Sequence, residues 1–416
     1  MKDNKNHIIA ALDIGSTKVV VAIASFSQGE VEVIGVGKSE NTGVRQGQIV
    51  NMADTQSAIQ EAKEEAELMA GVKLSQVYLS VGGQGVKATS SRGLVPVKNK
   101  DIDKGDIERV LEVAKAVHLP EESRILHALA QSYTVDGQPG IDSPISMQGV
   151  RLEVDAQLIT VSEKSLSNIL SCVQKVGLKV KQVVLDQYAS TLATVEKDEQ
   201  ELGVAVVEIG GGTCEIVVYK EGCISHVGSI PVGGLNFTQD VAVGLKTPLM
   251  SAEMIKKKYG TALVDMVGDD EMIDVEGLGD RKPRPVSRIE LSRILEARSE
   301  ETLSLIFQKL SEWDVLKDLG AGVIITGGGS LLQGIVELGE FTFDVPVRRG
   351  TPKNVVGMRE AYNSPIFSTA IGTLLFGYEQ EYKPASKIKT KANIMMNQTN
   401  GTWDQIKNFM SKALSI

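Results

Sequence analysis

Two stretches of the chain place an acid and then a glycine-containing turn at the end of a β-branched run. Residues 203–219 read GVAVVEIGGGTCEIVVY, in which the apolar run meets Glu208 and the turn covers Gly210 to Thr213. Because glycine has no Cβ, backbone N–H groups can converge there on an anion such as phosphate. Glu208 would then face a Mg²⁺ ion carried by that phosphate. A tight turn without a ligand explains this single stretch equally well.

The same order of residue types occurs near the start of the chain. Residues 8–24 read IIAALDIGSTKVVVAIA, where Asp13 takes the position of Glu208 and a β-branched run again follows the turn. Residues 321–335, AGVIITGGGSLLQGI, add a buried strand, three glycines and an apolar helix start at Ser330. Strand, glycine turn and helix N-terminus form a third potential anion or nucleotide cradle. The repetition indicates two similar α/β domains that face each other across a phosphate.

Composition limits the classes of function. The chain has 416 residues, and its apolar content of 42% is ordinary for a globular protein. Its formal net charge of −9 argues against nucleic-acid binding, which would need a basic surface. Its 3 cysteines show no metal-ligand spacing and are an odd number for a disulfide framework, so we expect a reducing compartment. The first apolar run is interrupted by Asp13, which argues against a signal peptide, and no run reaches the roughly 18 apolar residues of a membrane span.

The periodicity of apolar residues predicts the order of elements. Strands are expected over 31–36, 77–81 and 152–161, helices over 51–69, 106–117, 162–176, 251–259 and 289–310, and an exposed loop or hairpin over 265–288. A last apolar helix over 365–377 is expected to close the second domain. The change of pattern after residue 83 predicts an inserted subdomain, although this segment could also continue the first core.

The resulting prediction is an α/β fold with two domains. The expected parts are a first domain over 1–83 and 161–202, an inserted small α/β subdomain over 84–160, a second domain over 203–246 and 321–381, a nucleotide-side subdomain over 247–320, a linker over 382–401 and an amphipathic helix over 402–416.

Two further positions carry charges that could serve a site. Asp186 ends a predicted strand where a helix begins, so it could face a cleft or simply cap the helix. Glu253 and Lys256 are three residues apart on a predicted helix and can meet on one face, which also describes an ordinary surface ion pair.

The end of the sequence predicts attachment to a membrane surface. A polar stretch with Lys383, Lys387, Lys389 and Lys391 reads as a flexible tether, and Thr402 with Gln405 forms a capping-box pattern. At about 100° per residue, one face of the following helix collects Trp403, Ile406, Phe409, Met410 and Leu414, with Lys407 and Lys412 at its borders. The helix is only about 20 Å long, so it would lie on a bilayer rather than span it. Docking on its own domain is the alternative.

The order of these segments resembles the actin/Hsp70/sugar-kinase ATPase superfamily. The stretches GVRQGQIVNMADTQSAI, LDQYAS, GLKTPLMSAEMIKKKYG and GVRLEVDAQLITV resemble its bacterial cell-division family in particular. The resemblance implies ATP and Mg²⁺ as ligands and at most weak ATPase activity. It assigns phosphate binding to the two turns, with the residues Asp13, Gly15, Ser16, Thr17, Lys18, Gly210, Gly211, Gly212 and Thr213. It assigns the ribose to Glu253 and Lys256, and the adenosine to Gly327, Gly328, Gly329 and Ser330. Asp13 and Glu208 would bind Mg²⁺ through water, and Asp186 would orient a water molecule. Glu208 departs from the family, which usually has Asp there.

The resemblance also implies a scaffold rather than a metabolic enzyme. Such a protein would polymerise on the inner face of the cytoplasmic membrane at the septum. It would bind the C-terminal tail of the tubulin-like FtsZ through residues 286–301, with Arg298 as a contact. Its insertion would bind other division proteins. A small-molecule kinase of the same superfamily and a pilus-assembly actin relative are the alternatives. A kinase needs an acceptor site that the sequence does not reveal, and neither alternative explains the terminal helix.

Overall fold

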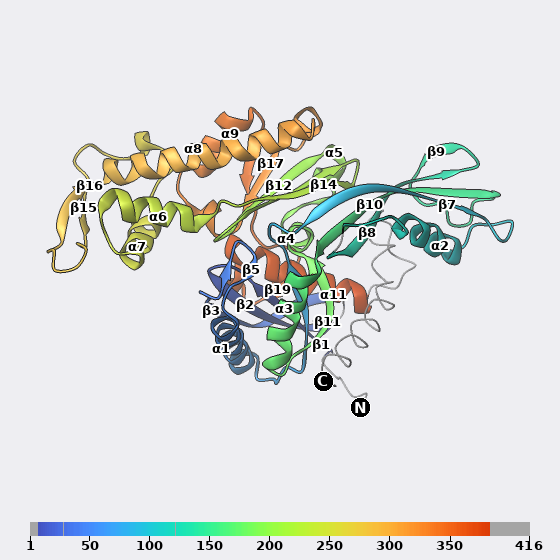
Figure 1. Cartoon of the computed structure of the whole chain (residues 1–416), viewed down its shortest axis with the longest axis horizontal. Coiled ribbons are helices and arrows are strands. Elements are labelled where there is room, and N and C mark those ends of the chain that lie inside the picture. Colours follow the sequence, from blue (N-terminus) through green and yellow to red (C-terminus); the bar gives the residue numbers. More distant parts are fainter. Residues whose placement is uncertain (1–6, 28, 121, 383–416) are drawn as a thin grey trace.

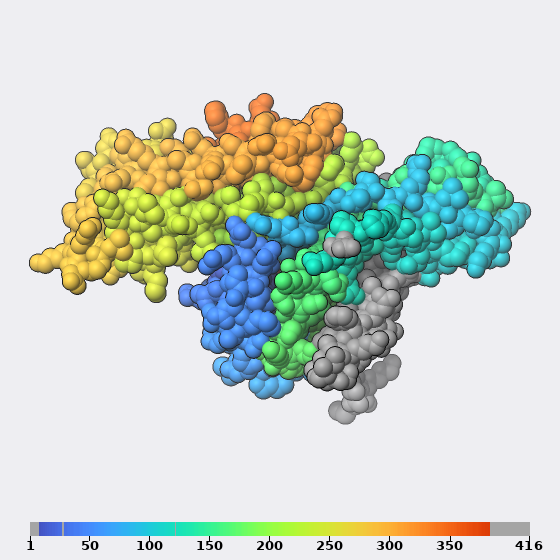
Figure 2. Space-filling view, viewed as in Figure 1, coloured from blue at the N-terminus to red at the C-terminus, as the bar shows by residue number. Residues whose placement is uncertain are grey.

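The structure is a computed structural model that describes residues 7–27, 29–120 and 122–382. Two central sheets carry most of the helices, and two smaller units project from them at opposite ends of the long axis (Figure 1). In the space-filling view the inserted domain and the α6–α8 region form these two ends, while the first domain lies below and between them (Figure 2).

The first sheet has six strands in the order β11-β6-β1-β2-β3-β19. Its strands are β1 (His7–Ile14), β2 (Lys18–Ser27), β3 (Glu30–Glu40), β6 (Gln76–Val81), β11 (Lys179–Leu185) and β19 (Val356–Gly357). Strands β1, β2 and β3 are antiparallel neighbours, whereas β6 and β11 run parallel to β1. The helices packed in this domain are α1 (Met52–Ala70), α3 (Glu163–Lys175), α4 (Asp186–Thr194) and α11 (Ser368–Tyr382). Since helices cover the sheet, β1 and β2 are almost continuously apolar.

The second sheet repeats this plan with five strands in the order β14-β13-β12-β17-β18. These are β12 (Val204–Ile209), β13 (Cys214–Lys220), β14 (Cys223–Ile230), β17 (Val323–Thr326) and β18 (Val347–Arg349). An antiparallel meander is again extended by parallel strands on one side. Helices α5 (Lys197–Leu202) and α9 (Ile335–Phe343) belong to this region. The two predicted hairpins, and the resemblance between them, are confirmed.

A small unit beside the second sheet has its own apolar core. It contains α6 (Gly234–Leu245), α7 (Leu249–Tyr259), the first half of α8 (Arg288–Glu312) and the hairpin of β15 (Met272–Val275) with β16 (Arg284–Ser287). The predicted boundary at residue 247 is wrong, because Phe237 and Val241 of α6 already pack into this core. The second half of α8 leaves this unit and packs against the core of the second sheet. The 265–288 segment does form a hairpin, but Ile273 and Val286 are buried.

The insertion forms a four-stranded antiparallel sheet in the order β7-β10-β8-β9. Its elements are β7 (Lys87–Pro96), α2 (Lys104–Lys115), β8 (Ser123–Val135), β9 (Gln138–Ile141) and β10 (Arg151–Ser162). A separate apolar core lies between α2 and the sheet. The apolar pattern predicted α2 and β10 but not β7 and β8, because polar residues interrupt the pattern in these two strands.

The last helix lies in a different domain from the one predicted. Ile371, Leu374 and Phe376 of α11 are fully buried in the core of the first domain, where the helix packs on α4, β1, β2 and β6. The chain therefore returns to the first domain, and assigning residues up to 381 to the second domain is wrong. The remaining short elements are β4 (Val44–Arg45), β5 (Gln48–Ile49), α10 (Arg359–Tyr362) and four 3₁₀ turns over Val264–Met266, Leu316–Asp318, Gly328–Leu331 and Pro365–Phe367.

Candidate nucleotide-binding site

The β1–β2 and β12–β13 hairpins close with the same turn. The N–H of Gly15 donates to the carbonyl oxygen of Lys18 at 2.9 Å, and the N–H of Gly210 donates to that of Thr213 at 2.9 Å. A Cβ added to Gly15 or to Gly210 would lie 3.1 Å from that same carbonyl oxygen. The two turns are therefore copies of one backbone structure, one in each domain.

These two turns also contact each other. A Cβ on Gly211 would lie 2.5 Å from Cγ2 of Thr17, and a Cβ on Gly212 would lie 2.7 Å from Oγ of Ser16. Real Cβ atoms do not approach other atoms so closely, so a side chain at either position would force its neighbour in the other turn to shift. The structure thus brings together the two phosphate loops predicted from the sequence.

Four carboxyl groups gather behind the turns. Asp13 and Glu208 are the last-but-one residues of strands β1 and β12. Asp186 is the first residue of α4, and Glu215 is paired with Glu208 across β12 and β13. The point that a Cβ on Gly82 would occupy is 2.4 Å from Oδ2 of Asp186 and 2.5 Å from Oε2 of Glu215. The side chains of Asp186 and Glu215 therefore face each other over Gly82, from different domains.

The carboxyl groups raise one another's pKa. Burial raises the pKa of Glu215 to about 8 and that of Glu208 to about 7, and in each case a neighbouring carboxylate adds to the effect. Burial also raises the pKa of Asp13, although the ammonium of Lys18 opposes it. Burial, followed by the charge of Glu215, raises that of Asp186 well above its usual range. Burial and the neighbouring carboxylates therefore favour the protonated form of Glu215 at neutral pH.

Glu215 is the functional candidate that the sequence analysis missed. It is buried, it accepts a hydrogen bond from the N–H of Gly83 at 2.7 Å, and its Oε2 has no hydrogen-bond partner in the described structure. A single acid in an otherwise apolar strand, two residues after Thr213, was the available signal. Oδ1 of Asp186 is likewise buried without a partner.

Asp186 is positioned through the inserted domain. The N–H of Leu185, the residue just before Asp186, donates to Nε2 of His127 at 3.1 Å. Burial lowers the pKa of His127 to about 4, so the ring stays neutral and Nε2 remains an acceptor. A residue of β8 thereby fixes the end of β11 from which Asp186 enters the cluster.

The carboxylate of Glu208 already has a hydrogen-bond partner in the first domain. The hydroxyl of Thr369, near the start of α11, lies 2.8 Å from Oε1 and 2.7 Å from Oε2 of Glu208. Since α11 belongs to the first domain, this contact links the two domains behind the turns. One hydroxyl hydrogen can serve only one of the two oxygens at a time.

The residues present fit a metal ion that arrives with a phosphate. The described residues contain no group of three or more His, Cys, Asp or Glu side chains that could hold a metal ion by themselves. The buried oxygens of Asp186 and Glu215 that lack partners are nevertheless suited to water-mediated contacts with such an ion. Gly210, Gly211 and Gly212 supply a cradle without side chains.

The predicted Glu253–Lys256 pair supports the second turn. Nζ of Lys256 lies 2.6 Å from Oε2 of Glu253, and it donates to the carbonyl oxygen of Gly234 at 2.9 Å and to the hydroxyl of Thr238 at 2.8 Å. Burial lowers the pKa of Lys256, while Glu253 opposes this effect. The N–H of Gly234 in turn donates to the carbonyl oxygen of Gly210 at 2.8 Å. The pair is therefore half-buried and connected to the turn, unlike a solvated surface pair.

The third glycine stretch differs from its prediction in one respect. No α-helix begins at Ser330, because Gly328–Leu331 is a 3₁₀ turn and α9 starts only at Ile335. Ser330 is fully buried, and its hydroxyl donates to the carbonyl oxygen of Gly327 at 2.7 Å. A Cβ on Gly329 would lie 2.2 Å from Cγ2 of Ile209, so the loop packs directly on the residue after Glu208.

Arg298 lies on α8, away from these turns, and is already paired. Its guanidinium binds both carboxylate oxygens of Asp240 and also binds Oε2 of Glu301 at 2.6 Å. It therefore ties α8 to α6 rather than offering an unpaired cation. The membrane residues predicted over 402–416 and the linker from residue 383 onward lie outside the described residues, and Tyr382, predicted as linker, is the last residue of α11.

Two sheets of the same plan, joined at facing glycine turns, define an actin-like fold. A chain in the solved structure of the "PilM-PilN type IV pilus biogenesis complex" aligns with it at a TM-score of 0.61 and 16% identity, over 89% of this chain and 98% of that one. At this identity the likeness shows the fold alone.

Sequence comparison identifies the family within this class. The family "Cell division protein FtsA" matches residues 205–372, and "SHS2 domain inserted in FTSA" matches residues 83–160. FtsA of Pseudomonas aeruginosa is 39% identical over 375 residues, 90% of each chain, and FtsA of Escherichia coli K12 is 34% identical over 411 residues, 97% of each. The chain therefore belongs to the FtsA family of cell-division proteins.

In the described part of the chain, no helix combines the length and the apolar character needed to cross a bilayer.

Proposed function

We propose that this chain is an ATP-binding scaffold that polymerises on the inner face of the cytoplasmic membrane and tethers FtsZ filaments to it at the septum. The observation that carries the proposal is the contact between the two glycine turns, with Ser16 and Thr17 of one domain against Gly211 and Gly212 of the other. A ligand held by both turns favours the closed arrangement of the two domains. ATP would thus act chiefly as a structural ligand.

The roles of the residues follow from their positions. Lys18 supplies the positive charge for the β- and γ-phosphates, while the N–H groups of both turns bind phosphate oxygens. Mg²⁺, when bound with the triphosphate, neutralises phosphate charge, and Asp13 and Glu208 would hold it through water. Asp186 and Glu215 can orient a water molecule, which allows at most weak hydrolysis. The ribose would lie at Glu253 and Lys256, and the adenosine at Gly327 to Ser330.

Membrane attachment and partner binding rest on the sequence and the family. One short amphipathic helix binds lipid weakly and reversibly, whereas many copies along a filament bind firmly because each further anchor acts at a high effective concentration. Polymerisation and membrane attachment therefore reinforce each other. The FtsZ tail is expected near residues 286–301, and other division proteins at the insertion.

The test uses two variants of the full chain, one that should lose ATP binding and one that should lose membrane attachment. Lys18→Ala should weaken binding of a fluorescent ATP analogue by about tenfold or more, since it removes a charge-assisted contact. Lys38→Ala, on an exposed part of β3, is the matched control and should bind normally. Removal of residues 403–416 should leave ATP binding intact and abolish co-sedimentation with anionic liposomes. ATP binding that survives in Lys18→Ala, or sedimentation that survives the deletion, would contradict the corresponding half of the proposal.

A further inference from the structure

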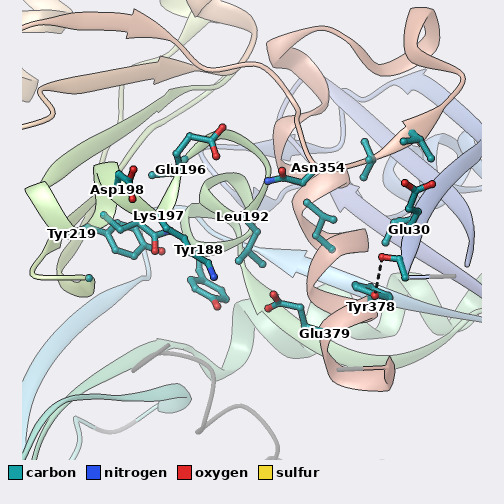
Figure 3. A pocket seen from close by; sticks show the side chains of 18 residues that line it. Glu30, Tyr188, Leu192, Glu196, Lys197, Asp198, Tyr219, Asn354, Tyr378 and Glu379 are labelled. Carbon is teal, nitrogen blue, oxygen red and sulfur yellow. Dashed lines mark hydrogen bonds between the residues drawn. The ribbon is translucent and has the colours of Figure 1, made fainter. Parts of the chain in front are cut away.

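A cavity of about 840 Å³ opens between the two domains (Figure 3). Its apolar lining includes Tyr188 and Leu192 of α4 and Leu375 of α11, whereas Tyr219 and Gly222 contribute from the second domain. The volume falls in the range of pockets that hold an organic ligand or a peptide segment. None of the residues assigned above to the phosphates, the ribose or the adenosine lines it.

The cavity is acidic. Its lining contains Glu30, Glu196, Asp198 and Glu379 but only one cationic residue, Lys197. Glu30 and Asp198 are exposed and lie toward opposite sides of the opening in Figure 3, and neither has an ion pair within the described part of the chain. Glu196 already pairs with Lys353 at 2.9 Å. An occupant with several positive charges would complement this lining.

The chain itself supplies such a segment at the edge of the cavity. Leu375, Tyr378 and Glu379 of α11 line the cavity, and α11 ends one turn later, at Tyr382. The end of the helix is fixed there, because the ring of Phe26 lies 4.5 Å from that of Tyr378 and 4.3 Å from that of Tyr382. The next residues of the sequence contain Lys383, Lys387, Lys389 and Lys391.

We propose that residues 383–391 fold back and dock in this cavity, with their lysines at the carboxylates of Glu30 and Asp198. Nine residues can reach about 30 Å when extended, which covers a cavity that begins within one helical turn of Tyr382. Each exposed ion pair is weak, so docking depends on several charges together and is reversible. High ionic strength would screen it.

Docking at this place has two consequences. The cavity walls come from both domains, Glu30 from the first and Gly222 from the second. An occupant would therefore restrain the movement of one domain relative to the other. The same lysines would also be withheld from an anionic bilayer. This second consequence alone rests on the proposed membrane function, whereas docking itself does not.

The test is zero-length carbodiimide cross-linking of the full chain without lipid, followed by mass spectrometry. Amide links should join lysines of 383–391 to Glu30 and Asp198, and their yield should fall at high salt. The double variant Glu30→Gln with Asp198→Asn leaves the lining acids Glu196 and Glu379, and it should lower links from these lysines to Glu196 by about fivefold. The matched control, Asp269→Asn with Glu337→Gln, removes two exposed acids that do not line the cavity and should change nothing.

Mixing light and isotopically heavy protein identifies the occupant. Links within one isotopic form support the proposal, whereas mixed links would show that a second copy fills the cavity and would overturn it. Absence of links to Glu30 and Asp198 in the native chain, under conditions where other exposed Lys–Glu pairs react, would also overturn it.

Lipid binding gives an independent reading. If docking withholds the lysines, the cavity double variant should bind anionic vesicles about fivefold more tightly than the native chain. If cross-links form but no form of the chain binds vesicles, the membrane function fails and the docking proposal survives.

Discussion

The β1–β2 and β12–β13 turns share a backbone but differ in charge. Both are closed by a 2.9 Å hydrogen bond from a glycine N–H to the carbonyl oxygen three residues later. Lys18 occupies the position in the first turn that Thr213 occupies in the second, and the second hairpin adds Glu215 to the acid that ends the first strand. One domain therefore provides the cation, while the other provides bare N–H groups and an additional carboxyl group.

The comparison also explains why the glycines are unequally distributed. Ser16 and Thr17 carry side chains, and these side chains fill the space that Cβ atoms on Gly212 and Gly211 would need. Two turns with side chains could not approach each other this closely. The two turns fit against each other because one of them has glycines where the other has side chains.

The largest expected effect comes from adding a side chain to the second turn. In Gly211→Ala, the new Cβ would lie 2.5 Å from Cγ2 of Thr17, so the turns must separate. Such overpacking costs about 1–3 kcal/mol, and we expect ATP affinity to fall by at least tenfold. Titration with a fluorescent ATP analogue measures this change.

Gly85→Ala is the matched control for that variant. Its new Cβ would meet Ser162 at an ordinary 3.4 Å, so ATP affinity should not change. Unaltered ATP affinity in Gly211→Ala would show that the contact between the turns is not needed for binding.

The two glutamates of the second hairpin should differ in the pH dependence of stability. Both have a raised pKa, so the folded state holds a proton that the unfolded chain releases above about pH 4.5. The stability that this proton confers is complete below that pH and is lost as the pH rises, up to about 7 for Glu208 and about 8 for Glu215. Glu215→Gln should therefore stabilise the nucleotide-free protein at pH 8, on the order of a few kcal/mol.

Thermal unfolding between pH 5 and pH 8.5 separates the two sites. Glu208→Gln should raise the Tm less than Glu215→Gln does, and its effect should be complete at a lower pH. At pH 5 the Tm of neither variant should differ much from that of the native chain. A gain in Tm for Glu215→Gln that is equal at pH 5 and pH 8 would contradict the raised pKa of Glu215 in the folded chain.

The features carried by local sequence were predictable. An acid, a glycine turn and a β-branched run specify the hairpin within about 17 residues, and two copies of it predicted the two domains and the equivalent positions of Asp13 and Glu208. Glu215 was missed because its importance depends on Gly82 and Asp186, which approach it only in the folded chain. In the same way, the apolar pattern of α11 marks it as buried but does not tell which of two similar sheets covers it.

The position of Ser330 illustrates a different limit. Glycines before an apolar run predict a helix start, yet here the hydroxyl of Ser330 turns back to Gly327 and the chain makes a single 3₁₀ turn. The packing of Gly329 against Ile209 selects that shape, and this contact joins residues that are 120 positions apart in the sequence. Tertiary contact thus overrides local preference at the loop predicted to meet adenosine.

The smallest effect concerns the hydrogen bond between Glu208 and Thr369 of α11, which joins the two domains. Thr369→Val removes the hydroxyl that lies within 2.8 Å of both carboxylate oxygens, and Glu208→Asp draws the carboxylate away from it. Each variant should lose about 1 kcal/mol of unfolding free energy, and because both remove the same hydrogen bond, the double variant should lose little more than either alone. Thr373→Val removes a buried hydroxyl that donates to the helix carbonyl of Thr369 at 2.8 Å. It is the control and should add independently to Glu208→Asp. Denaturant unfolding of the four chains of the cycle measures the coupling. If the losses from Thr369→Val and Glu208→Asp simply add, the contact carries no energy, and the longer acid of the second hairpin must be explained by its reach toward the phosphates instead.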